Sequence, residues 1–128
     1  MKLVNSLLEK GLEDGLVKGK ITPNTFDGDK RILKVLKENV PNFKCGYVVS
    51  WTPEQGEDLY SIVVNEKVIF KIEVNRIDLE EEVIWSAVPI KEYRKGLKGK
   101  PAQLGLEIAL KLLLEDAVVT ALPNEKMN

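Results

Sequence analysis

The sequence predicts an α+β fold: two N-terminal helices, a four-stranded antiparallel meander sheet and a long apolar C-terminal helix packed on the sheet. Three observations lead to this prediction. Apolar residues recur at helical spacing near the N-terminus, they alternate with polar residues in the middle of the chain, and helical spacing returns after Pro101. A length of 128 residues suits a single domain, which we expect over residues 1–122, followed by a disordered tail at 123–128.

Two helices are expected before the sheet. The first carries an apolar stripe at steps of four, formed by Val4, Leu8, Leu12 and Leu16. A loop containing Pro23 follows, and Thr25 or Asp27 is expected to cap the second helix, which ends at Pro41. The apolar face of this second helix consists of Ile32, Leu33, Leu36 and Val40.

Four strands are expected between residues 43 and 88. Short turns at 53–56 and 65–66 separate the first three, and short connections require antiparallel neighbours. The fourth strand is expected near 82–88. Alternation places Trp51 and Trp85 on apolar faces, which predicts core positions for both, and it predicts a buried, unreactive thiol for Cys45. The alternating apolar sets are Phe43, Cys45, Tyr47, Val49 and Trp51; Tyr60, Ile62 and Val64; and Val68, Phe70, Ile72 and Val74.

The C-terminal part begins with a basic segment at 90–100, whose Gly96 and Gly99 indicate a mobile loop or one broken turn of helix. The last helix is expected from Pro101 onward. One narrow polar stripe runs along it, formed by Gln103, Glu107, Lys111 and Glu115. The remaining positions are largely apolar, so we expect this helix to be buried on most sides.

Composition excludes several classes of activity. The chain has no histidine, so neither a Ser-His-Asp nor a Cys-His catalytic arrangement can form. Its single cysteine, Cys45, fits a reducing compartment. Charged residues interrupt both residues 1–20 and residues 104–121, so we expect neither a secretory signal nor a membrane span. These observations predict a cytoplasmic protein without a cofactor or metal.

Charge is distributed unevenly along the chain. Residues 1–53 carry a net charge of +3, residues 54–82 carry −6 and residues 83–128 carry +2. A nucleic-acid binder needs clustered basic residues without an opposing acidic block, so no nucleic-acid partner is expected. If the hairpin turns meet at one end of the sheet, they form an acidic patch for a basic partner; the alternative is a solvated turn. The patch would consist of Glu54, Glu57, Asp58, Asp78, Glu80, Glu81 and Glu82.

The second face of the sheet is too apolar to be simply solvated and too polar to be a second core. Such a mixed surface suits protein contact, although a helix covering it is an equally good interpretation. Its residues would be Val48, Ser50, Ser61, Val63, Ile69, Lys71, Glu73, Ile84 and Ser86.

A metal-dependent nuclease is a second hypothesis, because carboxylates and a lysine on a hairpin can build such a site without histidine. Asp58, Glu73 and Lys71 superficially resemble the set found in restriction-type nucleases. The position two after Glu73 is Asn75, however, where those enzymes have lysine. The plainer interpretation places Lys71 and Glu73 on a solvent face. The basic residues of 90–100 suit a solvated loop better than a phosphate contact.

In its size, acidic centre and lack of catalytic parts, the chain resembles bacterial immunity proteins, including those of contact-dependent growth inhibition systems. The resemblance covers the organisation of the whole chain and involves no signature motif. It implies a non-enzymatic protein that occludes the active site of a basic, nuclease-type toxin domain with its acidic residues. A self-associating structural or regulatory domain, perhaps paired through its sheet, is the alternative. The oligomeric state stays open.

Overall fold

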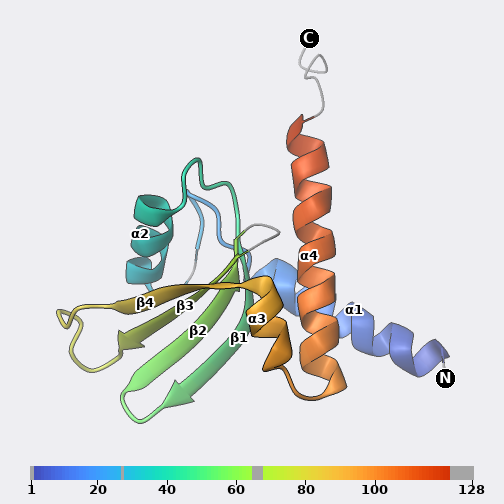
Figure 1. Cartoon of the computed structure of the whole chain (residues 1–128), viewed down its shortest axis with the longest axis horizontal. Helices are drawn as coiled ribbons and strands as arrows, with labels where there is room; N and C mark the ends of the chain where they lie inside the picture. The colour runs from blue at the N-terminus through green and yellow to red at the C-terminus, as the bar shows by residue number, and fades with distance from the viewer. Residues whose placement is uncertain (1, 27, 65–67, 122–128) are drawn as a thin grey trace.

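The computed structural model describes residues 2–26, 28–64 and 68–121, and it confirms the α+β fold (Figure 1). Four antiparallel strands lie in the order β1-β2-β3-β4, which is the expected meander. The predicted turn at 65–66 and the predicted tail at 123–128 lie outside the described residues. The elements are α1 (Lys2–Lys18), α2 (Lys30–Asn39), β1 (Tyr47–Glu54), β2 (Glu57–Val63), β3 (Val68–Asn75), β4 (Ile84–Pro89), α3 (Ile90–Lys95) and α4 (Lys100–Ala121).

The second helix begins later than its expected caps. Asp29 is the N-cap of α2, and its carboxylate accepts a hydrogen bond of 2.9 Å from the backbone N–H of Arg31. Thr25 is therefore not the cap: it pairs with Thr22 in the preceding loop, where the two hydroxyl groups lie 2.5 Å apart. Asp27, the other expected cap, is not among the described residues.

A bulge in β1 changes which side chains share a face. Tyr47 pairs with Val63 and Val48 with Ile62, but the next pair is Ser50 with Ser61, so Val49 is the extra residue. Trp51 consequently lies on the face opposite to Tyr47, at the sheet edge, and is 57% exposed. Trp85 lies on the other edge strand, stacks on Phe70 and is 40% exposed. The prediction that both tryptophans are core residues is therefore wrong.

Helices cover both faces of the sheet, and each face has its own core. In Figure 1, α4 and α1 lie on one side of the sheet and α2 lies on the other. The core beneath α1, α3 and α4 includes Leu16, Tyr47, Val63, Ile69, Ile90, Leu106 and Ala109. The core beneath α2 includes Ile21, Ile32, Leu36, Ile62, Phe70, Ile72 and Val74. The alternation predicted for the third strand is confirmed: its even-numbered apolar positions face α2.

The C-terminal helix is buried on one side only. Leu106, Ala109 and Leu113 are buried against α1 and the sheet, and the predicted polar stripe is exposed. Leu114 and Ala117 are also exposed, so α4 is less enclosed than the sequence predicts. No second layer of described residues covers the outer side of α4. The apolar residues on that side are therefore exposed.

Candidate functional site

The two hairpin ends meet at one end of the sheet, as the acidic-patch hypothesis requires. Glu54 pairs with Glu57 at the β1–β2 turn, and β3 ends at Asn75, opposite Glu57. The following residue, Arg76, donates its backbone N–H to the carbonyl oxygen of Gly56 at 2.7 Å. The loop between β3 and β4, residues 76–83, which we call the acidic loop, is thus tied to the β1–β2 turn.

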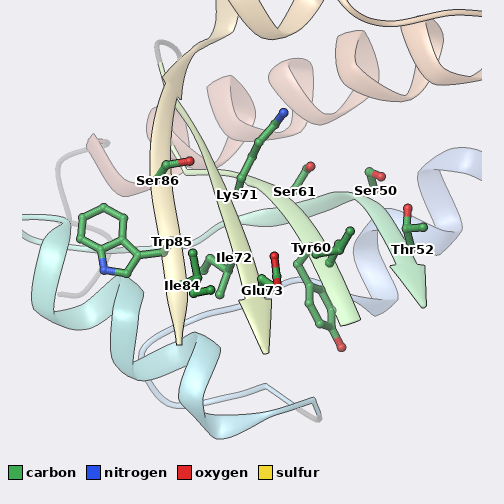
Figure 2. Close-up of a pocket in the computed structure, with 11 residues that line it drawn as sticks. Ser50, Thr52, Tyr60, Ser61, Lys71, Ile72, Glu73, Ile84, Trp85 and Ser86 are labelled. Carbon is green, nitrogen blue, oxygen red and sulfur yellow. The ribbon is translucent and has the colours of Figure 1, made fainter. Parts of the chain in front are cut away.

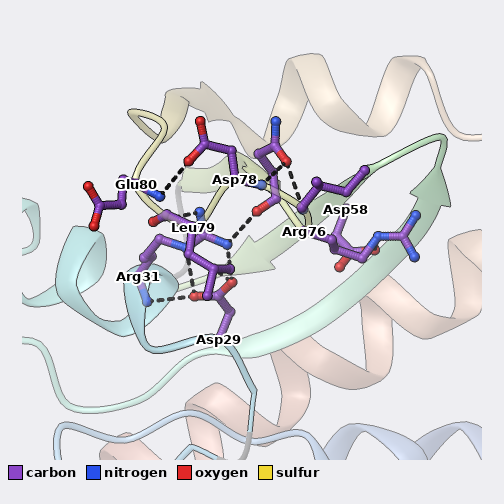
Figure 3. A network of polar contacts seen from close by, with 9 residues as sticks. Asp29, Arg31, Asp58, Arg76, Asp78, Leu79 and Glu80 are labelled. Carbon is purple, nitrogen blue, oxygen red and sulfur yellow. Dashed lines mark hydrogen bonds and ion pairs between the residues drawn. The ribbon is translucent and has the colours of Figure 1, made fainter.

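Side-chain caps fix the backbone of the acidic loop (Figure 3). Asn75 Oδ1 accepts hydrogen bonds from the backbone N–H groups of Ile77 and Asp78, each at 2.8 Å. Asp78 Oδ1 then accepts one from the N–H of Glu80 at 3.0 Å. These Asx-type contacts hold successive turns in place without a partner strand, so the side chains of the loop project from an ordered backbone.

Arg31 connects this loop to the start of α2 (Figure 3). Its guanidinium pairs with Asp29 at 2.6 Å and donates to the backbone carbonyls of Asn75 at 2.8 Å and Leu79 at 3.4 Å. Hydrogen bonds from Arg31 lower the pKa of Asp29, and the pair is largely shielded from solvent. One side chain therefore joins the start of α2 to the end of β3 and the acidic loop, more than 40 residues further along the chain.

The seven predicted site residues are not equivalent. Asp58 is only 8% exposed and forms an ion pair of 3.4 Å with Arg76, so it is not available to a partner. Its Oδ1 receives no hydrogen bond from any described residue. Glu57 lies on the same face of the sheet as Glu73, and repulsion between the two carboxylates raises the pKa of Glu57. The exposed acidic side chains at this end of the sheet are Glu54, Asp78, Glu80, Glu81 and Glu82.

Two apolar residues of the acidic loop were missed by the sequence interpretation. Ile77 is 82% exposed and Leu79 is 66% exposed, although both belong to the most acidic part of the chain. Ile77 lies against the backbone of Gly56, where an added Cβ would be 3.1 Å from its Cδ1. Exposed aliphatic side chains with a polar surround match the general plan of a protein interface, which has an apolar centre and a polar rim. The sequence signal was two aliphatic residues, Ile77 and Leu79, within an otherwise acidic loop.

The second sheet face is half covered and half open. Val63 and Ile69 are buried beneath the helices, whereas the other half forms an open groove of about 310 Å³ (Figure 2). The helix-cover interpretation is therefore right for part of this face, the protein-contact interpretation stays a prediction for the open part, and the bulge moves Val48 to the α2 side. Two cross-strand rows line the groove: Ser50, Ser61, Lys71 and Ser86, then Thr52, Leu59, Glu73 and Ile84.

The parts of the hypothetical nuclease site do not come together. Asp58 pairs with Val74 on the α2 face, whereas Glu73 pairs with Leu59 on the groove face. The two carboxylates therefore point to opposite sides of the sheet. Within the described ranges, no three acidic or cysteine side chains are grouped closely enough to hold a metal ion. Lys71 lies with its ammonium 5.8 Å from the ring centre of Tyr93.

A second polar cluster lies where α4 meets β1. Asp116 Oδ2 accepts hydrogen bonds from the Tyr47 hydroxyl at 2.5 Å and the Cys45 thiol at 3.5 Å, and it lies 3.2 Å from Lys20 Nζ. Burial raises the pKa of Asp116, but the contacts with Tyr47, Lys20 and Cys45 outweigh burial and leave it below its ordinary value. This cluster links α4 to the start of β1 and to the loop after α1.

Cys45 is buried, as expected, and its reactivity can be tested directly. Burial and the adjacent Asp116 carboxylate raise the pKa of its thiol to about 11. Because the thiolate is the reactive form, alkylation by iodoacetamide at pH 8 is expected to be slower by at least about tenfold in the native chain than in the unfolded chain. Mass spectrometry of timed samples measures both rates, and equal rates would contradict the expectation.

Sequence and structure comparisons leave this α+β domain without an assigned family. No family model, curated protein or solved structure matches the chain. No helix in the described part of the chain combines the length and apolar character that crossing a membrane requires.

Proposed function

We propose that this protein acts by binding another protein, and that the acidic loop and the adjacent β1–β2 turn form the binding surface. In its specific form, the proposal is an immunity protein that occludes the active site of a basic, nuclease-type toxin domain. The observation that carries it is an ordered loop presenting Ile77 and Leu79 to solvent among exposed carboxylates.

Preorganisation supports this proposal. Asn75, Asp78 and Arg31 already hold the loop backbone, so binding would require little further ordering of the chain. Glu80, Glu81 and Glu82 would accelerate encounter with a positively charged partner, and Ile77 and Leu79 would slow dissociation once they were desolvated. The acidic loop thus contains both the steering charge and the apolar centre that a stable protein complex needs.

The proposal can be tested by identifying a basic partner and measuring inhibition. The full chain is immobilised, proteins from the native host are captured at low salt, and captured basic proteins are purified and assayed for nuclease activity. Support requires stoichiometric inhibition of such an activity by the free chain. Captured proteins that retain full activity at saturation would contradict the toxin-inhibitor proposal.

Charge neutralisation then assigns the surface. The triple variant Glu80→Gln, Glu81→Gln, Glu82→Gln is expected to reduce the association rate about tenfold at low salt, with the difference shrinking as salt is added. A matched control neutralises Glu9, Glu13 and Asp14 on α1, which changes the net charge equally at a distant site. Surface plasmon resonance measures both rates. Equal slowing by the two triple variants would mean that net charge matters and the acidic loop does not.

A further inference from the structure

β4 is an edge strand without the usual protection against pairing. It is the last strand of the sheet, and no described strand lies along its outer side (Figure 1). Its first four residues are all exposed. Residues 84–88 contain neither a charged side chain nor a proline; Pro89 comes only at the end of the strand. Natural edge strands usually carry charge, proline or a bulge, because an open backbone edge attracts another strand.

The opposite edge of the same sheet shows such protection. β1 contains the bulge at Val49 and has Pro53 near its end. Just before it, Gly46 exchanges backbone hydrogen bonds of 2.9 Å with Ile21, and both α1 and α4 contact β1. The β1 edge is therefore protected against pairing and the β4 edge is not, so β4 is the edge that can accept a further strand.

Charges at the two ends of β4 indicate which strand it accepts. The acidic residues 80–82 precede β4, and Lys91 follows it in α3, where Arg94 pairs with Glu107 and Lys95 with Glu92. When two copies pair antiparallel through β4, the acidic segment of each lies beside Lys91 of the other. Parallel pairing would instead bring acidic segments together, at a cost in free energy. The surface is thus complementary to itself under two-fold symmetry.

We propose that two copies of this chain form a symmetric dimer through antiparallel β4–β4 pairing, which joins their sheets into one. In a joined sheet, the same face of each copy must lie on the same side. Even-numbered residues of one β4 therefore lie opposite even-numbered residues of the other, and odd-numbered opposite odd-numbered. Centring the pair on Ser86 puts the large Trp85 against the small Ala87 and Ile84 against Val88. Centring on Ala87 would put Trp85 opposite Pro89, which has no N–H to donate. The Ser86 register also aligns Glu81 with Lys91.

This dimer goes beyond the proposed inhibitor function; it shares the acidic residues 80–82 with the binding surface but involves neither Ile77 nor Leu79. It involves the exposed backbone edge of β4, where Trp85 stacks on Phe70, whereas the binding proposal relies on Leu79 and on Ile77 beside Gly56. A dimer-breaking change at Trp85 preserves every residue of the acidic loop.

The first test uses sedimentation velocity on the full chain from micromolar to millimolar concentration. The unmodified chain is expected to shift from monomer to dimer, and Trp85→Lys is expected to stay monomeric, because a lysine on an edge strand opposes pairing. Trp51→Lys is the matched control: it changes the other exposed tryptophan on the other edge and is expected to leave the dimer intact. An unmodified chain that stays monomeric at millimolar concentration overturns the proposal, as does equal disruption by the two variants.

A charge-swap experiment tests the orientation even if Trp85→Lys disturbs folding. Glu81→Lys and Lys91→Glu are each expected to weaken the dimer by about tenfold, since each introduces two like-charge contacts. Mixing the two variants restores both opposite-charge contacts, so a one-to-one heterodimer with near-original affinity is expected. The variant carrying both changes should likewise dimerise with itself. No recovery in the mixture would exclude this antiparallel arrangement.

Discussion

Replacing Arg31 with methionine is expected to lower the free energy of unfolding by about 2 to 3 kcal/mol and to release the acidic loop. Methionine keeps much of the side-chain volume and removes the charge. Asp29 would lose its ion-pair partner at 2.6 Å, and the carbonyls of Asn75 and Leu79 would lose a donor. The effect is large because this side chain connects the start of α2 to the acidic loop and is mostly shielded from solvent.

Two measurements check this expectation. Urea denaturation gives the loss of stability, and amide hydrogen exchange reports whether protection falls in residues 76–83. Lys34→Met on the same helix is the control, because Lys34 is exposed and makes only a 4.0 Å contact with Glu38. Its expected cost is below about 0.5 kcal/mol. If hydrogen exchange in the loop were unchanged in Arg31→Met, the anchoring role assigned to Arg31 would be wrong.

The fold was largely predictable because its signals are local and periodic. The alternation of Phe70, Ile72 and Val74 survives in the structure, since each strand pairs with its sequence neighbour through a short connection. The bulge at Val49 was not predictable from alternation. The extra residue at Val49 does not interrupt the apolar alternation in the sequence. It does shift the register by one residue, which moves Trp51 to the other face of the sheet.

The candidate site was predictable in part. The gathering of acidic residues at one end of the sheet follows from the hairpin order and was expected. The burial of Asp58 was not, because it depends on Arg76, which the bend after β3 brings back toward the start of β2. Anchoring of the loop by Arg31 is likewise a contact between residues far apart in sequence, and no pattern within a single element indicates it.

Asp116 is expected to make the stability of the protein depend on pH in the acid range. The pKa of Asp116 lies below its ordinary value in the folded chain, so its stabilising effect is present above the unfolded pKa of about 3.9. That stabilisation is lost as the pH falls through the folded pKa. Asp116→Asn should therefore cost about 1 to 3 kcal/mol at pH 7, because Tyr47 and Lys20 lose a charged acceptor. At pH 3 the cost should be smaller.

Urea denaturation at pH 7, 5, 4 and 3 measures this dependence. Glu115→Gln is the matched control on the same helix: Glu115 is exposed, so its neutralisation is expected to change stability by less than about 0.5 kcal/mol. Asp29 keeps its own lowered pKa, so some acid sensitivity should persist in Asp116→Asn. The gap between the unmodified chain and Asp116→Asn should narrow as the pH falls. A gap that stays constant from pH 7 to pH 3 would show that Asp116 stabilises α4 through packing alone, without its charge.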